Sequence, residues 1–157
     1  MISVSAVVND LGPSQKNFYM IKSFNTMSRL TEICASVFYE RPSVPVTKPF
    51  FACMGISFLS SYEGNAIATT LEEADQLLKS NTGCRKFLYL WDLEWLESPM
   101  HFSKVKDILS NEKLNIIVRS ESHATIVKNF CNTNVVGVVD DWNAEQLLNI
   151  LQENKNE

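Results

Sequence analysis

The apolar residues of this chain alternate between the two-residue period of a β-strand and the 3.6-residue period of an α-helix. Two late segments, IIV over 116–118 and VVGVV over 135–139, are apolar on both faces. Such strands are typical of parallel sheets, because helices cover both sides of a parallel sheet. The sequence therefore predicts an α/β domain: a doubly wound, mainly parallel, Rossmann-like sheet of about six to seven strands with helices on both faces.

The expected elements follow one another as strand and helix along the chain. Strands are predicted over 2–8, 32–39, 49–59, 65–69, 85–90, 114–118 and 135–139, and helices over 14–29, 71–80, 101–109, 122–130 and 142–152. Thr70 and Glu73 have the spacing of a capping box, and Asp141 or Asn143 is expected to cap the last helix. The apolar run 49–59 indicates a buried strand. Right-handed crossovers favour the strand order 3-2-1-4-5-6-7.

Composition places the chain among globular proteins and excludes several functional classes. Its 157 residues suit one domain over 1–152 followed by a polar tail over 153–157. The 45% of apolar and 20% of charged residues exclude a disordered chain. A net charge of −4 argues against nucleic-acid binding. No apolar stretch approaches the roughly 20 residues of a membrane helix, so no membrane contact is expected.

The cysteines argue against a metal site. Cys34, Cys53, Cys84 and Cys131 form no CxxC pair and have no histidine at ligand spacing. We therefore expect no metal and no cofactor. Cys34 and Cys53 lie in apolar runs, which predicts that both are buried. Unpaired thiols without a signal peptide favour a cytoplasmic location.

Ligands of open α/β sheets bind beyond the carboxyl ends of the strands, where the strand order reverses. The first such segment, 9–14, supplies Asn9, Asp10, Gly12 and Ser14. It lacks the GxGxxG and GxxxxGK[ST] patterns, which argues against a nicotinamide-type pyrophosphate site. Free N–H groups at the start of the following helix suit an anionic or sugar ligand. The alternative is an ordinary turn with Ser14 as a helix cap.

A second segment, 91–95, combines two indoles with two carboxylates. Trp91, Asp92 and Glu94 suit a sugar, which stacks on aromatic rings and donates hydroxyl hydrogens to acids; a paired-carboxylate hydrolase is also conceivable. The alternative is that Trp91 and Trp95 pack on the core and that the acids are solvated.

The third and fourth segments follow the two late strands. Arg119 suits a phosphate or an ion pair with Glu121, and Ser120 or Ser122 suits a helix cap. A serine nucleophile is disfavoured because no GxSxG elbow exists. The pair at 140–141 suits either a cation or the N-terminus of a helix.

Several stretches resemble the acceptor-side half of GT-B glycosyltransferases. They are AIATTLEEA over 66–74 followed by KFLYLWDLE over 86–94, IIVRSES over 116–122, and VVGVVDD over 135–141. The family's glycine-rich loop is reduced here to Gly12, and the chain ends where the second domain of that family begins. In the family, the second domain carries the nucleotide-sugar site and the acidic catalytic motif. The resemblance implies a sugar or nucleotide-sugar ligand, and a second polypeptide that supplies the donor site for any transfer.

These observations lead to one principal functional hypothesis and one alternative. The first is a glycosyltransferase-like domain, inactive alone, with a shallow crevice bounded by 9–14, 92–94 and 119–121, the start of helix 14–29 facing it, and millimolar sugar affinity. The alternative is a non-catalytic protein-interaction module, such as a viral or bacterial accessory protein. A receiver-like signalling domain is disfavoured, because Asp10 stands alone and no lysine follows the last strand.

Overall fold

The computed structural model of the chain describes residues 1–96, 101–133 and 135–153. It contains a seven-stranded sheet in the order β3-β2-β1-β4-β5-β6-β7, and every pairing is parallel. The predicted Rossmann-like class and strand order are therefore confirmed. The strands are β1 Ile2–Val8, β2 Ile33–Tyr39, β3 Ala52–Gly55, β4 Asn65–Ala68, β5 Arg85–Leu90, β6 Leu114–Val118 and β7 Val135–Val138.

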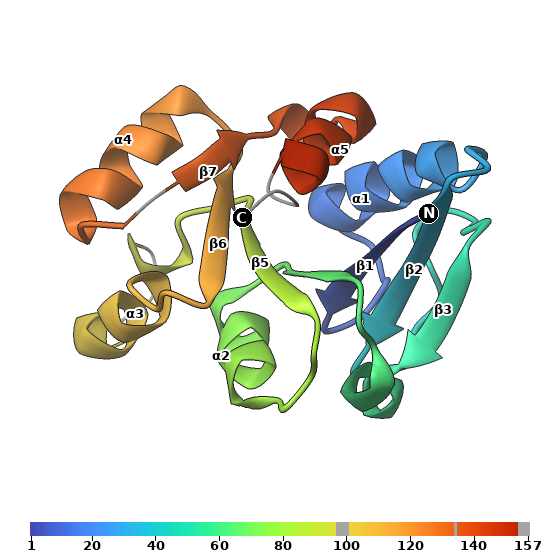
Figure 1. Ribbon diagram of the computed structural model, residues 1–157, viewed down its shortest axis with the longest axis horizontal. Helices are drawn as coiled ribbons and strands as arrows, with labels where there is room; N and C mark the ends of the chain where they lie inside the picture. The colour runs from blue at the N-terminus through green and yellow to red at the C-terminus, as the bar shows by residue number, and fades with distance from the viewer. Residues whose placement is uncertain (97–100, 134, 154–157) are drawn as a thin grey trace.

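Helices cover both faces of this sheet (Figure 1). They are α1 Gln15–Met27, α2 Leu71–Lys79, α3 Phe102–Leu109, α4 Glu121–Phe130 and α5 Ala144–Glu153. Helices α1 and α5 enclose one core, which contains Phe24 and Trp142. Helices α2, α3 and α4 enclose the other core, which contains Leu77 and Trp95. Burial of such large apolar side chains on both faces is the main force that holds the layers together.

Serine or threonine hydroxyl groups cap the N-termini of three helices. Ser14 Oγ accepts a hydrogen bond from the Asn17 N–H at 3.0 Å, and Thr70 Oγ1 accepts one from the Glu73 N–H at 3.2 Å. Ser120, rather than Ser122, caps α4. Each cap satisfies an N–H group that has no partner within its own helix.

The segment 49–59 was predicted to be one buried strand, and this is wrong. Only Ala52–Gly55 forms a strand, and Ile56–Ser61 forms a 3-10 helix. Strand β3 lies at the end of the sheet, where Ala52 is exposed and the other residues of the strand are half-buried. In the 3-10 helix that follows, Phe58 is 62% exposed. An apolar run alone does not distinguish a central strand from an edge strand.

The expected burial of two cysteines is also wrong. Cys34 is exposed and Cys53 is half-buried, whereas Cys84 and Cys131 are buried. Cys34 lies at the start of β2. All four thiols are free.

The chain enters α5 differently from the prediction, which began this helix at 142. Asp140–Trp142 forms a 3-10 turn in which Asp141 and Trp142 have positive φ angles of 41° and 60°. This backbone conformation is unusual for a residue with a large side chain. Of the two residues expected to cap this helix, Asp141 and Asn143, it is Asn143 whose Oδ1 accepts a hydrogen bond from the Gln146 N–H at 3.1 Å.

Two further expectations concern the polar tail and the membrane. The predicted polar tail, apart from Glu153, lies outside the described residues. Among the residues that the structure describes, no helix combines the length and the apolar character that crossing a membrane requires.

Candidate functional site

The strand order reverses between β1 and β4, and a cavity of about 350 Å³ lies beside this point. The chain leaves β1 toward α1 on one face of the sheet and leaves β4 toward α2 on the other. This divergence opens the edge of the sheet between the two connections. We call the cavity the strand-end crevice; it is lined by Asn9, Glu40, Arg41, Thr70, Glu72, Glu73 and Glu94.

Glu73 is the most buried polar side chain of the crevice, with an exposed fraction of 2%. Its Oε2 accepts hydrogen bonds from the Thr69 N–H at 3.1 Å and from Thr69 Oγ1 at 2.8 Å. Its Oε1 is buried and has no hydrogen-bond partner among the described residues. Burial raises the pKa of this carboxyl group, although the bonds from Thr69 oppose the shift. A buried polar atom without a hydrogen-bond partner is uncommon in folded proteins and marks Glu73 as a candidate functional residue.

Glu94 is the second partly buried carboxyl group of the crevice. It begins the 3-10 turn Glu94–Leu96 after β5, and its carboxyl group lies close enough to the Leu71 N–H for that group to lower its pKa. Burial raises its pKa, and the nearby negative charges of Glu73 and Asp92 act in the same direction. The N-terminus of α2 is therefore already occupied by an anionic side chain of the protein itself.

Lys16 is the cation that opposes these two carboxylates. Its Nζ donates a hydrogen bond to the Thr69 carbonyl at 3.3 Å, which ties α1 to the end of β4. Its positive charge lowers the pKa of both Glu73 and Glu94. Lys16 thus links the two sides of the sheet opening electrostatically.

The lining of the crevice is acidic. Four glutamates and one arginine give the lining a formal charge of −3, and Lys16, whose charge acts on Glu73 and Glu94, reduces the local charge to −2. The carboxylates, together with the Asn9 amide and the Thr70 hydroxyl, offer mainly acceptors with a few donors. Such a lining suits a ligand with several hydroxyl groups and repels phosphate.

Most of the predicted 9–14 segment forms a self-contained turn beside the crevice. Asp10 Oδ1 accepts a hydrogen bond from the Gly12 N–H at 2.8 Å. Asn17 Nδ2 donates to the carbonyl oxygens of Asp10 at 3.1 Å and Gly12 at 2.9 Å. Within the segment, Asn9 alone lines the crevice. Asp10, Gly12 and Ser14 therefore serve the geometry of the turn and the start of α1.

The predicted Trp91 and Arg119 meet each other instead of the crevice. The Arg119 guanidinium lies 3.8 Å from the centroid of the Trp91 ring. Its Nε and Nη2 each lie 2.9 Å from Asp141 Oδ1, so its partner is Asp141 and not Glu121. Trp91 is buried, and its other ring neighbours are Tyr19 and Tyr89. The guanidinium covers part of the ring that was predicted to stack on a sugar.

The remaining predicted residues also lie away from the crevice lining. Asp92 and Glu121 are exposed, and Ser120 caps α4. All strands are parallel, so these segments share one edge of the sheet with Asn9 and Glu94. However, β6 lies three strands from β1, a separation of about 14 Å at the usual strand spacing. Thus the structure brings Asn9 and Glu94 together and leaves Arg119, Ser120 and Glu121 apart.

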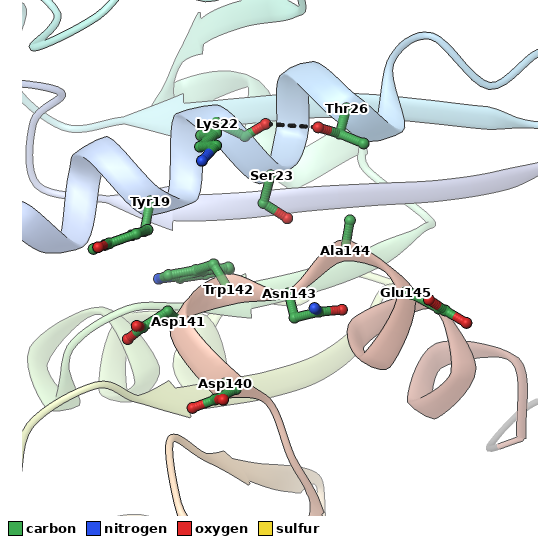
Figure 2. A pocket seen from close by; sticks show the side chains of 10 residues that line it. All are labelled: Tyr19, Lys22, Ser23, Thr26, Asp140, Asp141, Trp142, Asn143, Ala144 and Glu145. Carbon is green, nitrogen blue, oxygen red and sulfur yellow. Dashed lines mark hydrogen bonds between the residues drawn. The ribbon is translucent and has the colours of Figure 1, made fainter.

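A second cavity, of about 420 Å³, lies between α1 and the turn at 140–145 (Figure 2). Lys22 and Ser23 project from α1 toward this turn, and the Trp142 ring lies across the gap. Ser23 Oγ and Trp142 Nε1 are buried without a hydrogen-bond partner among the described residues. The Trp142 backbone N–H donates to Tyr89 Oη at 3.3 Å, which supports the unusual turn.

Sequence reasoning missed most of the crevice. Glu40 and Arg41 follow β2, and Glu72 lies in the first turn of α2. Thr70 and Glu73 were recognised as a capping box, which explained them fully in local terms. The missing signal was the burial of Glu73, since a cap of this type is usually solvated.

Within the described residues, no group of three or more histidine, cysteine or acidic side chains is placed to hold a metal ion. Comparison with known proteins found no matching family model, no matching curated protein and no matching solved structure.

Proposed function

We propose that this chain is a sugar-binding Rossmann-like domain that serves as the acceptor-side half of a glycosyltransferase-like assembly. The observation that carries the proposal is Glu73, a nearly buried carboxyl group with one unpartnered oxygen, which belongs to the lining of the strand-end crevice. The half-buried carboxylate of Glu94 lines the same cavity. Two carboxylates in a small polar cavity can each accept a hydrogen bond from a sugar hydroxyl.

The charge of the crevice selects among the ligands that the sequence suggests. A nucleotide or nucleotide sugar carries phosphate groups, which the formal lining charge of −3 disfavours. A neutral saccharide meets no such repulsion. We therefore assign the crevice to the acceptor sugar and not to the nucleotide-sugar donor.

The raised pKa values of Glu73 and Glu94 suit a role in transfer. A carboxyl group with an elevated pKa is a better proton acceptor at neutral pH than an ordinary one. Glu94, which is half-buried, is the better placed of the two to take a proton from an acceptor hydroxyl. The resemblance of 66–74 and 86–94 to GT-B enzymes supports this assignment. In that family a second domain holds the donor. We therefore expect this chain to bind a sugar by itself, and to transfer a sugar only together with a partner polypeptide.

Titration of the ¹⁵N-labelled protein with glucose, N-acetylglucosamine and maltose, followed by NMR, tests the binding. The expected result is saturable shifts of the amides of Asn9, Arg41 and 70–73, with a dissociation constant on the order of millimolar, or about 4 kcal/mol. E94Q should weaken binding about tenfold, since a hydrogen bond to a charged group contributes roughly 1.5–3 kcal/mol.

The matched control is E121Q, which removes an exposed carboxylate on α4 and should leave the affinity unchanged. UDP serves as the phosphate-bearing probe and should not shift these amides. Absence of saturable shifts with every sugar would overturn the proposal. Equal weakening by E94Q and E121Q would also count against the crevice.

The alternative of a protein-interaction module has one specific observation in its favour. Phe50 and Phe58 flank the edge strand β3 and are 61% and 62% exposed. Within the described residues, β3 pairs with β2 alone, so its outer edge is available to a strand of another protein. An affinity capture that depends on both phenylalanines and survives E94Q would favour this function over sugar binding.

A further inference from the structure

A cavity of about 470 Å³ lies at the amino-terminal ends of the strands, opposite the strand-end crevice, and is lined by basic residues. It lies between the loop that follows α2 and the starts of β5 and β6. Arg85, Lys86 and Lys113 line it, and no aspartate or glutamate does. We call it the basic cavity. Lys86 and Lys113 give it a formal charge of +2, because the Arg85 guanidinium is bound to the Asn65 side chain and the Leu151 carbonyl instead. This contrasts with the net charge of −4 of the whole chain.

Lys86 is the key residue of the basic cavity, because only 9% of it is exposed. Its Nζ donates one hydrogen bond, to the Ser80 carbonyl at 3.0 Å. This bond stabilises the C-terminal end of α2. An ammonium group has three N–H donors, so two remain without an acceptor among the described residues. A buried charge without a counter-ion is costly, which favours an anion beside it.

The other two cations are also without carboxylate partners. The ion pairs of the described residues involve Lys79, Lys104 and Arg119 as cations, and none of the cations of the basic cavity. Arg85 Nη1 donates to Asn65 Oδ1 at 3.1 Å and to the Leu151 carbonyl at 3.2 Å, which are neutral acceptors.

We propose that the basic cavity binds a phosphate group, with Lys86 as its buried anchor and Lys113 as its exposed clamp. A phosphate dianion matches more than one positive charge, and its oxygens accept hydrogen bonds from several donors at once. The Asn81 side chain, at the same wall, adds an amide donor. The site is independent of the proposed sugar site, because it lies at the opposite ends of the strands.

The test is an NMR titration of the ¹⁵N-labelled protein with inorganic pyrophosphate, at ionic strength held constant with sodium chloride. We expect saturable shifts of the amides of 80–86 and 113–115. K113Q should weaken pyrophosphate binding at least fivefold. The control, K128Q, removes an exposed lysine on α4 and changes the net charge equally, so it should weaken binding less than twofold.

Two further arms complete the test. K86M should abolish binding, and K113Q keeps the proposal testable if K86M does not fold. ADP distinguishes the source of the phosphate: tighter binding of ADP than of pyrophosphate indicates a nucleotide, and equal or weaker binding indicates the phosphate group alone. Absence of saturable shifts with both probes would overturn the proposal. So would equal weakening by K113Q and K128Q, which would indicate diffuse attraction.

Discussion

Replacement of Glu73 separates its two roles, as a helix cap and as a buried charge. E73A removes the acceptor for the Thr69 N–H and the Thr69 hydroxyl, both of which are buried. Each of these two donors, left without a partner, costs roughly 1–2 kcal/mol, the lower part of the range for buried groups, whereas the Thr70 cap of α2 is kept because its donor is the backbone N–H of residue 73. We therefore expect E73A to lower the free energy of unfolding by about 2–4 kcal/mol. For a domain of this size, that is a decrease in Tm of roughly 4–16 °C.

E73Q should behave differently. The glutamine carbonyl can still accept both hydrogen bonds from Thr69, and the amide nitrogen replaces the unpartnered Oε1. The buried charge is lost while the cap is kept. At pH 5 we expect E73Q to lie within about 1 kcal/mol of the wild type, as for a variant that keeps its buried hydrogen bonds.

The pH dependence follows from the direction of the pKa shift. Burial raises the pKa of Glu73 in the folded state, so the folded protein binds more protons than the unfolded chain. The stabilisation by the protonated carboxyl is complete below the unfolded pKa of about 4.3 and is lost as pH rises through the folded pKa. Wild-type stability should therefore fall as the pH rises above the unfolded pKa of about 4.3. E73Q should show a smaller fall, with the remainder due to Glu94, whose pKa is also raised.

Urea denaturation followed by circular dichroism at pH 5, 6, 7 and 8 measures these differences. The reasoning is refuted if E73Q is destabilised as strongly as E73A, because the bonds to Thr69 would then not be the cause. It is equally refuted if E73Q and the wild type show the same slope with pH.

Three further predictions test the packing, the caps and the ion pair. G137A should lower the free energy of unfolding, measured by urea denaturation, by about 1–3 kcal/mol, because the new Cβ would clash with Ile150 Cδ1 and lie 2.7 Å from Ile150 Cγ1. Adding I150V to G137A should recover part of that loss. S14A should cost about 1 kcal/mol and S14D much less, as judged from thermal melts, because aspartate also caps helices. R119K should lower the free energy of unfolding by up to about 1 kcal/mol in the same melts, because lysine cannot keep both the planar contact with Trp91 and two bonds to one carboxylate. An equal loss in R119A would support this reason, and an unchanged Tm in R119K would contradict it.

The order of the strands was predictable because several local signals agreed. Segments such as 116–118 are apolar on both faces and require helices above and below them. Thr70 and Ser14 mark helix starts by side-chain chemistry that operates within four residues. Handedness of the crossovers then leaves few arrangements. Edge strand β3 escaped this logic, because its exposure depends on its neighbours and not on its own residues.

The site was harder to predict, for a physical reason. The rule that ligands bind at strand ends selects one edge of the sheet, and both Asn9 and Glu94 lie there. It does not say which strand ends share a cavity. The crevice draws Glu40 and Arg41 from β2, because β2 is the neighbour of β1 on the other side of the reversal. Sequence order gives no hint of this, since Glu40 and Arg41 precede three prolines and belong to no predicted strand or helix.

Charge segregation explains why composition was a poor guide to the ligand. The net charge of −4 averages an acidic crevice at the carboxyl ends of the strands with a basic cavity at their amino ends. The net charge alone cannot locate either cavity. The two cavities lie at opposite edges of one rigid sheet, farther apart than the roughly 8–10 Å over which salt leaves charges effective. Each should therefore select its ligand by its own lining, so that a sugar and a phosphate group bind without competing. Competition between maltose and pyrophosphate in the NMR titrations would contradict this separation.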